Sequence, residues 1–164
     1  MLFIRKKIVS LHTISITHYT MSKYNITEKK EKNAAYRSMV KAELVDELYE
    51  KIVTELFVKK KYRDPKYSAK ALAEDLGTNT RYISAVVNLR FHDNYSTIVN
   101  EHRIKEAMYM LCDKRYENYT MEEISKTVGF ANRQSFYAAF FRMKGMSPRA
   151  YKEAQLKLMK NNKK

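Results

Sequence analysis

The sequence predicts an all-α protein, and three observations carry that prediction. Only 3 of the 164 residues are glycine and 2 are proline, fewer than a sandwich of short strands and tight turns would need. Apolar residues recur in several stretches at the i, i+3, i+4, i+7 spacing of a helix face. Ser, Thr or Asn, the residues that cap helix starts, precede most of these stretches. We expect about seven helices.

The chain is strongly basic, with a formal net charge of +14 from 32 Lys and Arg against 18 Asp and Glu. This balance favours a polyanionic partner, with nucleic acid first and an anionic membrane surface second. No apolar run reaches the ~18 residues of a membrane span, so no membrane partner is expected. Cys112 is the only cysteine and the four histidines lack ligand spacing, so we expect no metal or other cofactor. These features fit a cytoplasmic protein.

Residues 1–41 form a predicted flexible leader. A basic cluster at residues 5–7 precedes a short β-branched run, but His12 interrupts the run and no signal-peptide cleavage site follows. Met21 is a second candidate start. Because all helical periodicity lies downstream, we expect the chain to fold without Met1–Thr20.

The first helix is expected over Ala42–Lys60. Acidic residues lie toward its start and lysines at its end, the order that suits the helix dipole. One face is apolar and consists of Val45, Leu48, Tyr49, Ile52, Leu56 and Phe57. This face is as wide as docking inside a domain requires, and a dimerisation helix is the alternative.

A helix-turn-helix is expected over residues 68–88. Ser68 caps its first helix, Gly77 ends that helix, and Asn79 or Thr80 caps a second helix that runs to about Asn88. The exposed front of this second helix is expected to be Arg81, Ser84 and Ala85, with Tyr82 and Asn88 at its margins. After a loop at Phe91–Tyr95, a long helix is expected over Ser96–Asp113, with an apolar face of Ile98, Ile104, Ala107, Met108 and Leu111.

A second helix-turn-helix is expected over residues 120–143. Thr120 caps its first helix, Gly129 ends that helix in the left-handed conformation, and Asn132 caps the next. Gly145 ends this second helix. Ser147 and Pro148 then start a last helix that continues to about Lys157, and residues 158–164 form a basic tail.

The front of the second helix in this motif carries Arg133, Gln134, Tyr137 and Ala138. Arg and Gln are the side chains that pair bidentately with guanine and adenine edges in the major groove. A short helix that follows a glycine turn and carries such residues is typical of a recognition helix. The alternative is a three-helix packing unit with solvated polar residues.

The same stretch resembles the arabinose-regulator (AraC/XylS) family of bacterial transcription factors. The resemblance rests on Ile124, Gly129-Phe130, Phe136, Phe140-Phe141-Arg142 and the tail from Gly145 through Ser147-Pro148 to Tyr151. It covers roughly Ala42–Tyr151. It implies one homeodomain-like DNA-binding domain at residues 42–157, in which a long linker helix joins two helix-turn-helix motifs.

By this resemblance the domain reads two successive major grooves, which recur about every 34 Å. The expected base-reading residues are Arg81, Ser84, Ala85, Arg133, Gln134, Tyr137 and Ala138. The expected phosphate contacts are Asn88, Arg103, Arg142 and Lys144, of which Arg103 also has a structural role. Ser84, Ala85 and Ala138 have short side chains that offer only short contacts to bases. The first motif, which contains Ser84 and Ala85, is therefore expected to position the protein on DNA more than it reads bases.

The predicted function is that of a sequence-specific transcriptional regulator, with double-stranded DNA as partner and RNA polymerase as a further candidate. Family members usually carry a separate effector domain, for which this chain has no room, so no small-molecule effector is expected. No catalytic constellation is visible, and we expect no enzymatic activity. A protein-interaction adaptor with weak nonspecific nucleic-acid binding and a basic RNA-binding protein are the alternatives.

Overall fold

The computed structural model describes residues 42–161, so the expectations for residues 1–41 and for the end of the tail lie outside it. Within the described part the structure contains seven α-helices and no strand, which confirms the predicted all-α class. The elements in order are α3 (Ala42–Val53), the π-helical turn η1 (Thr54–Val58), the 3-10 turn η2 (Lys61–Arg63), α4 (Ala69–Asp75), α5 (Thr80–Phe91), α6 (Tyr95–Cys112), the 3-10 turn η3 (Lys114–Tyr116), α7 (Met121–Thr127), α8 (Arg133–Lys144) and α9 (Pro148–Asn161).

Most of the predicted helix starts are confirmed by their hydrogen bonds. The long helix expected from Ser96 starts one residue earlier, at Tyr95, with Asn94 as its cap. A side-chain oxygen accepts from the backbone N–H three residues on at Ser68, Asn79, Thr120 and Asn132. Glu123 completes a capping box, because its carboxylate accepts from the Thr120 N–H at 2.7 Å. Ser147 in the same way accepts from Ala150 at the start of α9.

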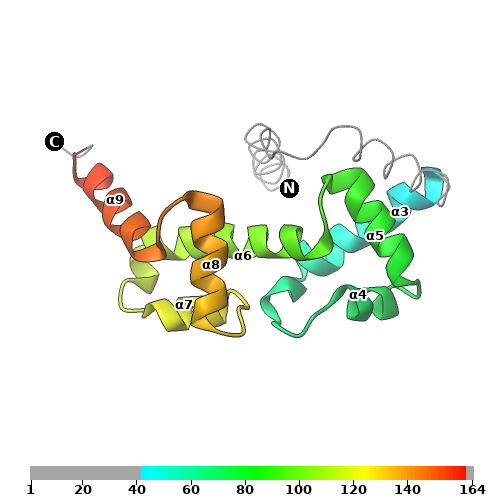
Figure 1. The fold of residues 1–164 in the computed structure, drawn as a ribbon, viewed down its shortest axis with the longest axis horizontal. Coiled ribbons are helices and arrows are strands. Elements are labelled where there is room, and N and C mark those ends of the chain that lie inside the picture. The colour runs from blue at the N-terminus through cyan, green and yellow to red at the C-terminus, as the bar shows by residue number, and fades with distance from the viewer. Residues whose placement is uncertain (1–41, 162–164) are drawn as a thin grey trace, which may run out of the picture. The chain divides into compact units, whose positions relative to one another are not determined.

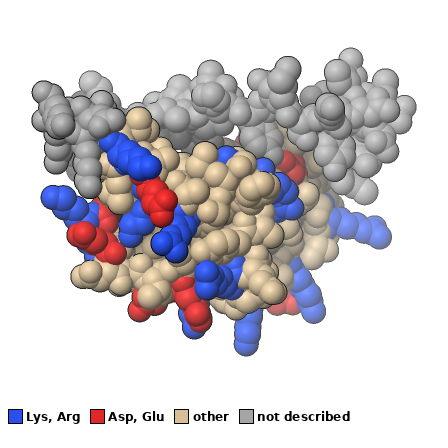
Figure 2. Space-filling model, turned by 60° about the vertical axis from the view of Figure 1, so that its left-hand side comes forward, with Lys and Arg blue, Asp and Glu red and all other residues tan. Residues whose placement is uncertain are grey.

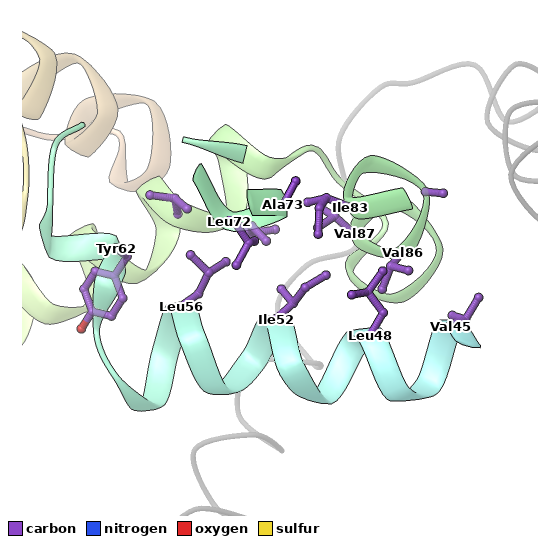
Figure 3. Packing of buried hydrophobic residues seen from close by; sticks show 13 residues of the cluster. Val45, Leu48, Ile52, Leu56, Tyr62, Leu72, Ala73, Ile83, Val86 and Val87 are labelled. Carbon is purple, nitrogen blue, oxygen red and sulfur yellow. The ribbon is translucent and has the colours of Figure 1, made fainter. Parts of the chain in front are cut away.

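The first hydrophobic core lies between α3, α4 and α5. Figure 3 shows Leu48 and Ile52 of α3 and Leu56 of η1 projecting from one side toward Leu72 and Ile83. The predicted apolar face of α3 is therefore confirmed, and it is covered inside the domain as expected. Burial of several large aliphatic side chains, each favoured by about 1.5–3 kcal/mol, holds this three-helix group together.

The second core lies between α6, α7, α8 and α9, and its largest buried side chains are Phe136 and Phe140. α6 belongs to both cores: Ile98 and Val99 in its first half are buried in the first, and Ile104 and Leu111 in the second. Figure 1 shows α6 running as one unbroken helix from the α3–α5 group to the α7–α9 group. The predicted linker helix thus contributes buried side chains to both cores.

Three predicted helix ends are wrong. α9 continues beyond Lys157 to Asn161, so the first residues of the expected tail are helical. The helix expected over Ala42–Lys60 gives way after Val53 to a π-helical turn, and Lys60 takes the left-handed conformation with φ of 57°. α5 continues beyond Asn88 to Phe91, because the Phe91 ring packs against Tyr49 of α3 at a centroid distance of 5.3 Å. The loop expected at Phe91–Tyr95 therefore shortens to residues 92–94.

The two helix groups are joined at η2, in a contact that we call the η2 joint. The Arg103 guanidinium of α6 donates from Nε to the Tyr62 carbonyl at 2.7 Å and from Nη2 to the Asp64 carbonyl at 3.0 Å. On the other side of η2 the Arg63 backbone lies against Gly129, with φ of 99°, so closely that a Cβ there would be 2.5 Å from the Arg63 oxygen. Only glycine fits this contact.

Gly129→Ala is expected to destabilise the domain far more than Gly77→Ala or Gly145→Ala. All three glycines have positive φ, so each substitution carries the left-handed penalty of about 1–2 kcal/mol. At Gly77 and Gly145 a Cβ meets nothing within 4 Å, whereas at Gly129 it collides with backbone. Urea unfolding of the three variants measures the difference, and equal losses of unfolding free energy would contradict the η2 joint.

Candidate nucleic-acid interface

α5 and α8 are set apart from the other helices by their charge. Each has 12 residues, each starts at an Asn cap after a glycine turn, and neither contains an Asp or Glu. The acidic residues of each motif lie instead on the preceding helix: Glu74 and Asp75 in α4, Glu122 and Glu123 in α7. The second helix of each motif therefore presents a face free of acidic side chains, as contact with a polyanion requires.

The structure places Arg133, Gln134 and Ala138 at the surface of α8 and leaves Tyr137 half-buried. Arg133 does not extend freely into solvent. Its Nη2 donates to the Tyr137 hydroxyl at 3.3 Å, and its guanidinium lies 5.0 Å from the Tyr137 ring centroid. Tyr137 therefore holds the arginine on one side of the helix, so Arg133 populates fewer rotamers than a free side chain would.

Sequence reasoning missed Phe141 on this same face. Its side chain is 60% exposed, and with Gln134 and Ala138 it completes an i, i+4, i+7 line along α8. The helical spacing would have found it, but the residue type suggested core. An exposed aromatic ring beside Ala138 makes the middle of this face apolar, which suits thymine methyl groups better than polar base edges.

α5 offers a narrower face. Arg81 and Ser84 are exposed, as expected, and Asn88 is partly buried with its Oδ1 lacking a hydrogen-bond partner. The expectation for Ala85 is wrong: this residue is fully buried in the first core and cannot reach a base. α5 packs against both α3 and α4, so its buried face is wide and includes Ala85 together with Ile83, Val86 and Val87.

Some cations on and near these two helices are neutralised by acidic side chains and others are not, and within α5 itself Arg90 pairs with Asp46. Arg81, Arg142 and Lys144 form no ion pair with any described residue, whereas Lys61, Arg63 and Lys126 all pair with acids. On the face in Figure 2 the Lys and Arg side chains alternate with Asp and Glu around an uncharged area. Attraction to a polyanion therefore depends on particular unpaired side chains.

Comparison with known proteins agrees with this arrangement. A family model described as a helix-turn-helix domain, of the AraC type, matches residues 72–154, which is half of the chain. The chain belongs to the AraC-type helix-turn-helix family. The domains of this family are the DNA-binding parts of transcriptional regulators.

Solved structures show the same fold. The chain is similar to the C-terminal domain of AraT, a response regulator from Geobacillus stearothermophilus, with TM-score 0.57 and 19% identity over 67% of this chain and 84% of that one. It is also similar to the C-terminal domain of the response regulator yesN from Fusobacterium nucleatum, with TM-score 0.56 and 20% identity over 63% and 97% of the chains.

A third structure is a DNA-binding transcriptional dual regulator from Escherichia coli K-12, with TM-score 0.56 and 14% identity over 67% and 93% of the chains. A search of curated protein sequences finds no match. Among residues 42–161 no helix is long and apolar enough to cross a membrane, and no group of His, Cys, Asp and Glu is arranged to hold a metal ion.

In this AraC-type domain the expected structural role of Arg103 is confirmed by its two hydrogen bonds to the η2 joint, while its phosphate role stays a prediction. Glu106, one turn along α6, accepts from the Tyr62 hydroxyl at 3.0 Å and pairs with Arg63. Burial by itself would raise the pKa of Glu106, but the hydrogen bonds from Arg63 and Tyr62 lower it below its ordinary value. Burial raises the pKa of Tyr62 to about 12, so this hydroxyl stays a donor.

Arg103→Ala is expected to lower the free energy of unfolding by about 2–4 kcal/mol, because two carbonyls of the η2 joint lose a charged donor. Arg90→Ala is the matched control, since Arg90 is an exposed arginine that pairs with exposed Asp46 and its loss should cost less than about 1 kcal/mol. Urea unfolding compares the two variants. A loss for Arg103→Ala no larger than that for Arg90→Ala would show that the joint does not depend on the guanidinium.

Proposed function

We propose that this chain is a sequence-specific transcriptional regulator that places α5 and α8 in two successive major grooves on one side of double-stranded DNA. The observation that carries the proposal is the pairing of two acid-free, Asn-capped helices through one continuous helix that is part of both cores. Because each half of α6 packs into one of the two cores, the distance between the two motifs is fixed before binding. A preset spacing suits a ligand whose grooves recur about every 34 Å.

The main base contacts are assigned to α8. Arg133 is held at the first turn of the helix by Tyr137, within the part that enters a groove most deeply. Gln134, which is exposed and forms no side-chain hydrogen bond with the described residues, is suited to an adenine edge. Ala138, with Phe141 added to it, offers apolar contact to thymine methyl groups.

The first motif is assigned a smaller share of base recognition. Arg81 is the one long side chain on the exposed front of α5, with Ser84 beside it and Asn88 at the margin. Arg142 and Lys144 are assigned to backbone phosphates, which fix the register of the protein on the duplex. RNA polymerase stays a predicted partner, and DNA binding without a small-molecule effector stays a prediction.

Selection of bound duplexes from a random DNA pool tests the proposal. The expected result is a site with two conserved segments about one helical turn apart, of which the segment that α8 contacts is the more strongly conserved. Binding to this site should persist at physiological salt, where nonspecific electrostatic binding has largely been lost. A pool that yields no preferred sequence would favour an adaptor with nonspecific nucleic-acid binding.

Arg133→Ala and Lys144→Ala are expected to weaken DNA binding in different ways. Loss of a bidentate contact from Arg133 should cost about 1–3 kcal/mol and relax the preference at one base pair. Loss of Lys144, at the far end of α8, should weaken binding to all sequences alike and reduce the salt slope by about one unit.

The measurement is the affinity of each variant for the selected site and for its single-base variants over a range of salt. If Arg133→Ala weakened every sequence equally and left the base preferences unchanged, Arg133 would be a backbone contact. The assignment of the base-reading residues would then be wrong, while DNA binding itself would stand.

A further inference from the structure

A hollow of about 320 Å³ lies between α6, α8 and the segment that follows η2. Its α8 side consists of small residues, including Ser135 and Ala138, and Arg142 stands at the end of this row. Asn100 lines it from α6, and Arg103 and Phe130 line it as well. Because the side chains in the row are short, a space remains that longer side chains would have filled.

The hollow is positively charged. Arg103 and Arg142 line it, and no Asp or Glu does. Arg103 is 91% buried and is held by the two carbonyls of the η2 joint, so its charge has a fixed position. Its guanidinium also lies 5.5 Å from the Phe130 ring centroid. Charge fixed beside apolar surface attracts an anion more strongly than the same charge on a mobile side chain in water.

The remaining polar groups of the hollow are available donors. Arg142 is exposed and forms no ion pair or hydrogen bond with the described residues. The structure gives no partner within residues 42–161 to the Ser135 hydroxyl or the Asn100 amide. One guanidinium, one hydroxyl and one amide around a cationic hollow match the oxygens of a single phosphate group.

We propose that this hollow binds one backbone phosphate of DNA, in the stretch of strand that passes between the two grooves entered by α5 and α8. Arg142, Ser135 and Asn100 donate to the phosphate oxygens, and Arg103 supplies fixed positive charge behind them. The inference rests on the proposed function. It follows from the position of the hollow, since Ala138 belongs both to its lining and to the proposed reading face of α8.

DNA is favoured over a free anion because the hollow is open to solvent. A small anion would keep much of its hydration there. A duplex bound by α5 and α8 already holds its phosphates in position, so binding one of them in the hollow costs no further translational or rotational entropy.

The test uses the full chain and a set of duplexes that carry the selected site. In each duplex one phosphate of the segment between the two half-sites is replaced by a neutral methylphosphonate. For the wild type, one position on one strand should weaken binding roughly tenfold, the effect of losing one charge-assisted contact. A series in which no position has an effect would overturn the proposal.

Arg142→Ala then identifies the protein partner of that phosphate. This substitution should weaken binding to the unmodified duplex roughly tenfold. The variant should then bind the methylphosphonate duplex no more weakly than the unmodified one, because the substitution and the methylphosphonate remove the same interaction. Lys144→Ala is the matched control, a cation two residues further along α8 that does not line the hollow. It should weaken binding but keep the full methylphosphonate effect. If the effects of Arg142→Ala and the methylphosphonate multiplied, Arg142 would not contact that phosphate.

A double variant, Asn100→Ala with Ser135→Ala, tests the neutral donors and should reduce the methylphosphonate effect without changing base preferences. Circular dichroism checks that each variant is folded. Titration of the DNA-free protein with inorganic phosphate, followed by NMR at the Asn100 and Ser135 amides, tests the other source, and saturation below millimolar phosphate would overturn the assignment to DNA.

If the wild-type protein showed no sequence preference in the selection from random DNA, the proposed function as a whole would be overturned. An intact preference with a flat methylphosphonate series would overturn only the phosphate site.

Discussion

Two hydrogen bonds from one buried guanidinium hold the halves of this domain together. Arg103 donates to the carbonyls of Tyr62 and Asp64, two backbone groups of a turn that belongs to the first helix group. Burying a charged group is costly unless its donors are satisfied, and burial does lower the pKa of this guanidinium without depriving it of its proton. The arrangement therefore persists only while the turn stays in place. Arg103 and the η2 turn determine each other's position.

The close approach at Gly129 gives this contact a second side. With Arg63 backbone against a residue that has no Cβ, the η2 turn is held between α6 and the turn of the second motif. The two cores share α6, and neither α3–α5 nor α7–α9 can rotate about it without breaking backbone contacts. In the proposed binding to two successive grooves, such rigidity would lower the entropy lost on binding and limit which groove spacings fit.

The two motifs are alike in sequence but differ in packing. Both have a capped helix, a glycine turn and a second capped helix, and this much follows from local rules. α5, however, is packed between α3 and α4, which buries Ala85 and leaves a narrow exposed front. α8 keeps Gln134, Ala138 and Phe141 at the surface. The packing thus leaves a wider exposed front on α8 than on α5, which is why the proposal assigns the main base contacts to α8.

The sequence by itself determined the helices, their caps, the apolar helix faces that form the two cores and most of the exposed residues at the front of α8. These features depend on residues no more than about four positions apart. The tertiary structure alone decided the burial of Ala85, the extension of α5 to Phe91, the partners of Arg103 and the hollow beside Arg142. Each of these depends on contacts between segments far apart in the chain. The Arg103 hydrogen bonds span about forty residues and end on backbone carbonyls, which every residue has, so no side-chain pattern could have indicated them.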